Sequence, residues 1–297
     1  MSETAQRPAP IVSARGLRKH FGRTEILHGL EFDIPAGRIY GLVGHNGAGK
    51  TTTLNALLGL TSYEGTVRVL GKDPYRKRAE LMENVAFISD VASLPRFLRV
   101  RELFALVSNI HPKFDQGKAR AFLEGTDVRM EARIKHLSKG MIAQLHLAVV
   151  MAIDARLLVL DEPTLGLDIT YRKRFYRRLL EDYMTGERTL LITTHQVDEI
   201  EFMLSDIMFI RDGDLVLHMR METVSTKYAQ LLVDPANVAA ARALGPIYAE
   251  TRFGQTAMVF DGVDRERLEA LGAVSTPTLS DLFVALMQRT PGAGERR

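Results

Sequence analysis

The sequence predicts an α/β protein built on a mixed β-sheet. Short apolar runs at residues 39–43, 85–88, 157–160 and 190–192 are separated by longer helix-capable segments. This spacing is typical of parallel strands whose sheet is covered by helices on both faces. Residues 11–34 instead contain apolar side chains that alternate with polar ones, which indicates half-buried antiparallel strands at the N-terminal end.

The remaining elements follow from changes in pattern along the chain. Between residues 90 and 157 the strand-like runs disappear, and helical spacing there predicts an inserted helical region at about 91–156. Asp212-Gly213 between two apolar runs predicts a β-hairpin. Beyond residue 221 the pattern changes again, and we expect a small α+β unit at 223–290 that ends in a helix over 279–287.

The length and composition are those of an ordinary globular protein. The 297 residues are 46% hydrophobic and 25% charged, which excludes disordered and collagen-like classes and predicts about two domains. We expect the main domain to span residues 11–222, with residues 1–10 and 291–297 as disordered tails. The start of the chain lacks the apolar core of a signal peptide.

The charge balance and the apolar runs exclude several classes of protein. There are 39 Lys and Arg against 36 Asp and Glu, a balance too even to indicate nucleic acid as a partner. The absence of cysteine excludes disulfides and thiolate metal sites. The longest apolar stretch, residues 145–153, is far shorter than the roughly 20 residues of a membrane-spanning helix. We therefore expect any action on a membrane to require another subunit.

A glycine-rich loop at residues 44–51 carries the most specific chemistry. It reads GHNGAGKT and matches the pattern G-x-x-x-x-G-K-[ST], in which backbone N–H groups and a helix N-terminus surround phosphate oxygens. Lys50 would neutralise the β- and γ-phosphates, and the Thr51 hydroxyl would ligate Mg²⁺. The predicted phosphate-binding residues are Gly44, His45, Asn46, Gly47, Ala48, Gly49, Lys50, Thr51 and Thr52.

An acidic pair follows the apolar run at 157–160. Asp161 ends this run and Glu162 comes directly after it, so both carboxylates are expected at the carboxyl edge of the sheet, where ligands of open α/β sheets bind. Asp161 is the candidate to hold Mg²⁺. Glu162 is the candidate to orient or deprotonate an attacking water. Taken alone, the pair is equally compatible with an ordinary strand end.

Four motifs occur together in an order and spacing that resemble the ATP-binding cassette (ABC) ATPases. They are residues 44–51, the sequence LSKGM at 137–141, LLVLDEPTLGLD at 157–168, and His195. The resemblance covers about residues 11–224 and implies a P-loop NTPase fold of the ABC type. Within the family, the LSKGM signature and the TTHQVDEIE stretch are most similar to bacterial ABC-2-type exporter ATPases.

The resemblance implies roles for further residues. Phe21 falls where the family stacks an aromatic ring on adenine, although a strand residue of the core is the alternative. Ser138 and Gly140 match the signature loop, which covers the γ-phosphate bound by the other subunit of a head-to-tail dimer. Asp168 matches a loop that meets this partner, and His195 matches a histidine that contacts the γ-phosphate.

Asp90 departs from the family pattern. The family normally carries Gln at this position, where it reaches Mg²⁺ and the attacking water. Asp is shorter and charged, so it could ligate Mg²⁺ or serve only as a hinge. Arg96, Arg99 and Arg101 follow in the segment on which the family docks a membrane subunit, and partner contact and simple solvation are equally compatible with them. A second basic cluster, at residues 172–178, is interpreted as the solvated face of a helix.

We therefore expect the ATP-binding and ATP-hydrolysing subunit of a bacterial ABC transporter, with ATP and Mg²⁺ as cofactors. The resemblance implies a second ATPase subunit, identical or homologous, and a separate membrane permease. It places the chain in the cytoplasm, on the inner face of the cell membrane, with export favoured over import. The alternative is a non-transport ABC ATPase that acts on nucleic acid, ribosomes or the assembly of another complex. A non-hydrolysing regulator is disfavoured because Lys50, Asp161, Glu162 and His195 are all present.

Overall fold

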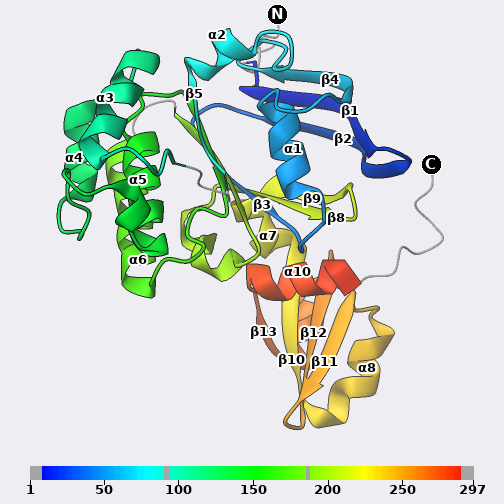
Figure 1. Ribbon diagram of the computed structural model, residues 1–297. Helices are drawn as coiled ribbons and strands as arrows, with labels where there is room; N and C mark the ends of the chain where they lie inside the picture. The colour runs from blue at the N-terminus through cyan, green and yellow to red at the C-terminus, as the bar shows by residue number, and fades with distance from the viewer. Residues whose placement is uncertain (1–8, 90–93, 185–187, 289–297) are drawn as a thin grey trace, which may run out of the picture.

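The computed structural model describes residues 9–89, 94–184 and 188–288. The tails expected at 1–10 and 291–297 therefore lie outside the described residues, apart from residues 9 and 10. Asp90 lies outside them as well. Figure 1 shows three parts: two β-sheets on the right, a group of helices on the left, and a smaller unit below.

A six-stranded mixed sheet forms the centre of the protein, with strand order β5-β6-β7-β3-β8-β9. The first five strands are parallel, and β9 pairs with β8 in antiparallel orientation. The strands are β3 (Ile39–Val43), β5 (Val85–Ile88), β6 (Leu157–Asp161), β7 (Thr189–Thr194), β8 (Asp206–Arg211) and β9 (Asp214–Arg220). The predicted mixed sheet and the predicted hairpin are confirmed.

A second, antiparallel sheet lies beside it, with strand order β2-β1-β4. Its strands are β1 (Val12–Phe21), β2 (Thr24–Ile34) and β4 (Glu64–Val69). Helix α1 (Lys50–Leu57) follows β3, and its Leu54 and Leu57 are buried in one apolar core with Leu17 and Val159. This core fixes α1 between the two sheets, as Figure 1 shows. The short helix α2 (Arg78–Met82) precedes β5.

The helices at the left of Figure 1 arise largely from the predicted insertion. They are α3 (Val100–Ile110), α4 (Gln116–Leu123), the 3-10 turn η1 (Ile134–His136) and α5 (Lys139–Met151). Phe104, Ala119, Leu145 and neighbouring residues form their own apolar core. Helix α6 (Ile169–Arg178) follows β6 and continues as a π-helical turn, η2 (Leu179–Tyr183), and the 3-10 turns η3 (Val197–Glu199) and η4 (Glu201–Met203) follow β7.

The C-terminal unit is an antiparallel sheet with strand order β11-β12-β10-β13. Its elements are α7 (Met221–Lys227), β10 (Tyr228–Val233), η5 (Pro235–Asn237), α8 (Val238–Ala243), β11 (Tyr248–Arg252), β12 (Gln255–Asp261), α9 (Arg265–Glu269), β13 (Gly272–Ser275) and α10 (Leu279–Gln288). Helix α10 lies between this sheet and the six-stranded sheet (Figure 1). Its Leu279, Leu282 and Leu286 belong to the main apolar core with Phe209. The last helix is therefore an integral part of the main core.

Candidate nucleotide-binding site

The glycine-rich loop connects β3 to the N-terminus of α1, and we call residues 44–51 the phosphate loop. Gly49, the N-cap of α1, has φ 108°, and a Cβ at this position would lie 2.8 Å from a methyl carbon of Leu27. Only glycine fits this combination of left-handed backbone and close packing. The loop therefore leads its backbone directly into the first turn of α1, whose N–H groups attract anions.

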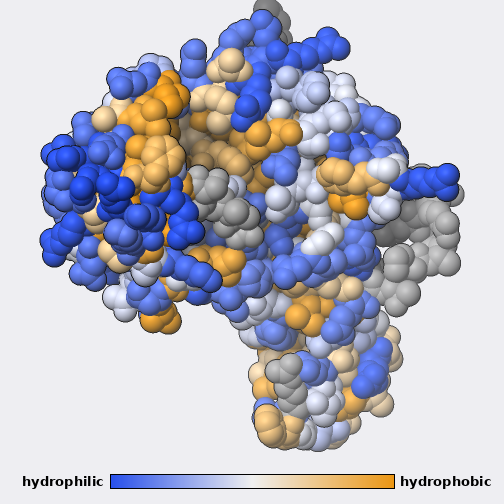
Figure 2. Space-filling model, viewed as in Figure 1, coloured by the Kyte–Doolittle hydropathy of each residue, from blue (hydrophilic) through white to orange (hydrophobic). Residues whose placement is uncertain are grey.

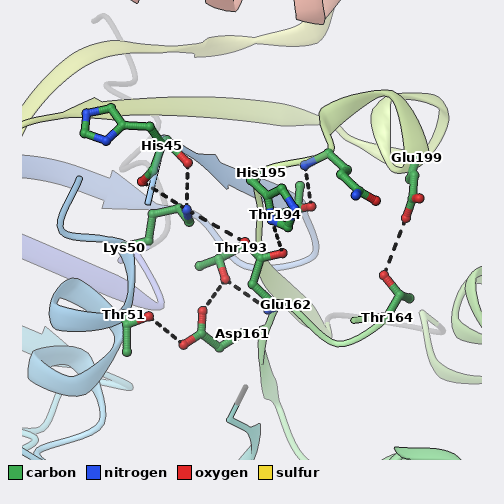
Figure 3. Close-up of polar contacts among 12 residues, drawn as sticks. His45, Lys50, Thr51, Asp161, Glu162, Thr164, Thr193, Thr194, His195 and Glu199 are labelled. Atoms are coloured by element: carbon green, nitrogen blue, oxygen red, sulfur yellow. Dashed lines mark hydrogen bonds and ion pairs between the residues drawn. The ribbon is translucent and has the colours of Figure 1, made fainter. Parts of the chain in front are cut away.

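Lys50 is buried within the curve of the phosphate loop. Its Nζ donates a hydrogen bond to the backbone oxygen of Gly44 at 2.6 Å and lies 3.7 Å from Oε1 of Glu162 (Figure 3). Burial lowers the pKa of Lys50, while Glu162 and Asp161 act in the opposite direction. The ammonium group is thus held at the centre of the loop, where it can compensate the charge of a phosphate.

Asp161 joins the phosphate loop to the central sheet. Thr51 Oγ1 donates to Asp161 Oδ2 at 2.9 Å, and Thr193 Oγ1 donates to Asp161 Oδ1 at 2.5 Å (Figure 3). The carboxylate is buried at the end of β6. A hydroxyl and a carboxylate side by side are the hard oxygen ligands that Mg²⁺ accepts together with water and phosphate oxygens. Thr51 and Asp161 therefore fit a magnesium site.

Glu162 sits in a strained backbone conformation directly after the strand. Its φ is 47°, in the left-handed region that residues other than glycine rarely adopt. Its Oε2 lies 2.9 Å from Nδ1 of His195, and its side chain is 15% exposed. Non-glycine residues in such conformations cluster at functional sites. The geometry places the carboxylate between Lys50 and His195.

The phosphate loop, Asp161 and Glu162 line one cavity of about 340 Å³. Phe21 also lines it and is 57% exposed, so the ring is not part of the core, and Lys19 Nζ lies 4.9 Å from the ring centroid. The lining consists of Phe21, Ile26, His45, Asn46, Gly47, Gly49, Lys50, Thr51, Thr52, Asp161 and Glu162. Three predicted residues adjoin the cavity without lining it: Gly44 contributes the oxygen that binds Lys50, Ala48 of the loop is buried, and His195 contacts Glu162.

Ser138, Gly140 and Asp168 do not line the cavity either. Ser138 is the N-cap of α5 and accepts a hydrogen bond from the backbone of Met141, and Asp168 is the N-cap of α6 and accepts one from Tyr171. Gly140 lies in the first turn of α5. Ser138 and Asp168 thus contact the first turns of their own helices, and the nearest atom to a Cβ at Gly140 would be the backbone oxygen of Gly166, 3.9 Å away. Asp90, the last predicted magnesium ligand, lies outside the described residues.

Sequence reasoning missed Thr193. Its hydroxyl binds Asp161, and both its backbone oxygen and its hydroxyl oxygen accept hydrogen bonds from the Glu162 N–H at 3.2 Å. The signal was present, because two parallel strands that both end near the ligand edge bring Asp161 and Thr193 opposite each other. Polar residues at the end of a neighbouring parallel strand are therefore candidates for the same site.

The fold and the site together define a nucleotide-binding protein of the P-loop class, and the comparisons with known proteins identify its family. Residues 27–165 match the ABC transporter family. The Nod factor export ATP-binding protein I of Burkholderia lata is 34% identical over 212 residues, which cover 69% of this chain and 69% of that protein. The ABC transporter ATP-binding protein YtrB of Bacillus subtilis is 26% identical over 222 residues, covering 74% and 76%.

A solved structure of the ATP-binding subunit of an ABC transporter shares this fold. It covers 72% of this chain and 91% of its own, with a TM-score of 0.66 at 20% sequence identity. The chain belongs to the ABC ATPases and is an ATP-binding subunit of an ABC transporter. The resemblance drawn from the sequence motifs is thereby confirmed. None of the helices in the described ranges is long and apolar enough to cross a bilayer.

Proposed function

We propose that this chain hydrolyses ATP to drive export through a separate membrane permease. The proposal depends on the position of Glu162. Its carboxylate lies between Lys50 and His195, at the cavity that the phosphate loop lines. The name of the Burkholderia relative as an export protein supports the direction of transport. The transported substrate would be bound by the permease.

In the proposed mechanism, the loop N–H groups, the N-terminus of α1 and Lys50 hold the triphosphate and stabilise charge on the γ-phosphate. Thr51 and Asp161 would hold Mg²⁺, which supplies further positive charge to the phosphates. Glu162 accepts a proton from the attacking water at one carboxylate oxygen. His195 contacts Oε2 of Glu162 and thereby orients the carboxylate toward the water. The exposed ring of Phe21 would stack on adenine.

A second ATPase subunit would complete the site. Ser138, Gly140 and Asp168 carry the family's interface motifs but lie outside the cavity of their own chain. In the proposed head-to-tail dimer, the signature loop of one subunit covers the γ-phosphate bound by the other, so closure and hydrolysis are coupled.

The helical region offers a surface for the permease. Figure 2 shows hydrophobic residues at the surface of this region, among hydrophilic ones. Phe97 and Ile110 are more than 70% exposed there. Arg99 and Arg101 nearby contact Glu131 through its backbone oxygen and its carboxylate respectively, which orients both guanidinium groups. Docking here would hold the chain on the inner face of the cell membrane.

The test replaces Glu162 by Gln, which keeps the shape of the side chain but removes its basicity. We expect the variant to bind ATP as the wild type does and to lose at least about a hundredfold in turnover. It should also accumulate as a dimer with ATP and Mg²⁺, measured by size-exclusion chromatography with light scattering. Turnover at the wild-type rate would refute Glu162 as the base.

The permease is tested separately. Membranes from cells that express the tagged Glu162→Gln variant are solubilised, and the proteins that copurify with it are identified. A membrane protein with several spanning helices supports transport. Ribosomes or nucleic acid in its place would support the non-transport alternative.

A further inference from the structure

The turn between β8 and β9 contacts the phosphate loop from behind. The backbone N–H of Gly213 donates to the oxygen of Ala48 at 3.0 Å, and the oxygen of Gly213 accepts from the N–H of His28 at 3.0 Å. Gly213 has φ 84°, and a Cβ there would lie 2.3 Å from the oxygen of Ile26. The turn therefore lies between β2 and the phosphate loop, with no room for a side chain at its centre.

The two aspartates of this turn each contact a histidine of a different element. Oδ1 of Asp212 lies 3.0 Å from Nε2 of His45 in the phosphate loop, and Oδ2 of Asp214 lies 3.1 Å from Nδ1 of His28 in β2. The other ring nitrogen of His45 lies 2.8 Å from the oxygen of Asn46. The His45 ring points away from the Lys50–Glu162 pair (Figure 3). It thus offers a contact by which the turn can hold the loop at a distance from the Lys50–Glu162 pair.

The residues just before the turn contact the C-terminal helix. Arg211 Nη1 donates to the backbone oxygens of Leu286 at 2.9 Å and Met287 at 3.3 Å, in the last turn of α10. A cation at this position satisfies carbonyl groups that the helix itself leaves without partners. The ring of Phe209 packs edge-on against Phe283 of α10, with centroids 5.2 Å apart.

The alternation of strand β8 separates these contacts onto two faces. Phe209 belongs to the core that includes α10, while Ile210 belongs to the core beneath the phosphate loop. A Cβ at Gly44 would lie 2.6 Å from the oxygen of Ile210, so the loop rests directly on this strand. One segment, residues 209–213, therefore contacts α10 on one side and the phosphate loop on the other.

We propose that this segment transmits the position of α10 to the phosphate loop, with Arg211 and Asp212 as positioning residues. Arg211 fixes the end of β8 to α10, and Asp212 fixes His45 to the end of β8. A shift of the C-terminal unit would then change the affinity of the loop for nucleotide. The proposal rests on nucleotide binding by the phosphate loop, and it needs neither the proposed permease nor the proposed dimer.

The first test compares Asp212→Asn with Asp214→Asn. Asp212 has φ 48°, which Asn tolerates, so the substitution removes the charge with little backbone strain. We expect Asp212→Asn to weaken ADP·Mg²⁺ binding about threefold by calorimetry, the size typical of an exposed charged contact. Asp214→Asn is the matched control, because its partner His28 lies in β2, and its dissociation constant should stay within about 1.5-fold of the wild type. Equal affinities for Asp212→Asn and the wild type would overturn the proposal.

The second test asks whether the two positioning residues act in series. Arg211→Gln removes the contact with α10 and should also weaken ADP·Mg²⁺ binding about threefold. The double variant should be no weaker than either single variant, because both break the same link, whereas independent effects would multiply to about ninefold. A ninefold loss, or an unchanged affinity of Arg211→Gln, would overturn the link.

Two further measurements separate positioning from a general loss of structure. In the hydrolysis assay, the variants should raise the KM for ATP with kcat unchanged, because only the binding of nucleotide is altered. Thermal unfolding is measured for each variant. A lower melting temperature with wild-type ADP affinity and wild-type KM would assign the turn a structural role only and refute the proposal. Failure of the wild type to bind ADP would instead refute the nucleotide site itself.

Discussion

The family's motif residues form two groups in this chain, which we call the phosphate side and the signature side. Among the described motif residues, only those of the phosphate side contact one another. On the phosphate side, Lys50, Thr51, Asp161, Glu162 and His195 come from α1, β6 and the end of β7, and they contact one another directly. On the signature side, Ser138 and Asp168 accept hydrogen bonds from the first turns of their own helices. Folding of this chain alone brings the phosphate-side residues together, whereas Ser138 and Asp168 lie exposed at the N-termini of their helices.

Replacing Lys50 by Met should cause the largest loss of ATP binding. The ammonium is buried and pairs with Gly44 and Glu162, so its loss removes the charge partner of the phosphates and leaves Glu162 less compensated. We expect ATP affinity to fall by about a hundredfold to a thousandfold, as for other buried charged pairs. Calorimetry measures the affinity. Lys113→Met is the control, since its Nζ donates to Asn84 away from the cavity, and comparable losses in both variants would contradict a specific role for Lys50.

Replacing Gly140 by Ala should change the signature side and leave the phosphate side intact. The added Cβ would have only the oxygen of Gly166 nearby, at 3.9 Å, so this chain accommodates it. Ala in place of Gly also favours the helix by up to about 1 kcal/mol. Stability and ATP binding should therefore be kept, while turnover falls about hundredfold if the methyl group displaces a second subunit's phosphate by about 1 Å. Unchanged turnover would show that no second chain approaches Gly140.

Mixing two inactive variants tests this directly. A chain with Gly140→Ala keeps an intact phosphate side, and a chain with Lys50→Met keeps an intact signature side. If a second copy completes the site, the mixture regains ATPase activity that neither variant has alone. A mixture that stays inactive would contradict completion by a second copy and favour a homologous subunit in its place.

The phosphate side could be predicted from the sequence because its motifs are short and local. The phosphate loop and Glu162 directly follow strands, Asp161 is the last residue of its strand, and the strand order of a parallel sheet brings them together. The two sheets and the helical insertion also followed from periodicity, since period-2 and helical spacing are properties of neighbouring residues.

What the sequence did not predict depends on contacts between distant segments. Thr193 reaches Asp161 only because β6 and β7 are paired in a particular register. The role of Arg211 depends on Leu286 of α10, which lies 75 positions further along the chain. The interpretation of residues 172–178 as a solvated helix face also missed Arg172, which binds Glu199 and the oxygen of Leu167. Such pairings leave no periodic signal in the sequence.

The free energy of unfolding should also depend on pH, through His146 of α5. Burial lowers the pKa of His146 to about 4, and its buried Nδ1 has no hydrogen-bond partner among the described residues. In the unfolded chain His146 binds a proton near its ordinary pKa of about 6.5. Its contribution to stability is therefore intact above pH 6.5 and is lost as the pH falls toward 4, by about 2 kcal/mol at pH 5.

His146→Leu should remove this loss. The side chain has no hydrogen bond at Nδ1 to sacrifice, and α5 is apolar on both neighbouring faces. Urea unfolding at pH 7.5 and pH 5 measures the free energy of unfolding of both proteins. The variant should gain about 2 kcal/mol relative to the wild type between the two pH values, and an equal decline in both would exclude His146 as the acid-sensitive group.

Substitutions of Asp168 should change turnover less than those of Lys50 or Gly140. As an N-cap it can be replaced by Asn almost without loss, whereas Ala costs about 1 kcal/mol of stability. As an interface residue it would act through its charge, which Asn and Ala both remove. If the carboxylate contacts a second subunit, turnover falls about threefold in both variants although only Asp168→Ala is less stable. Steady-state ATPase assays rank the wild type and the two variants by turnover, and thermal unfolding ranks them by stability. Turnover that follows stability, with Asp168→Asn like the wild type and only Asp168→Ala impaired, would assign the carboxylate to the first turn of α6 alone.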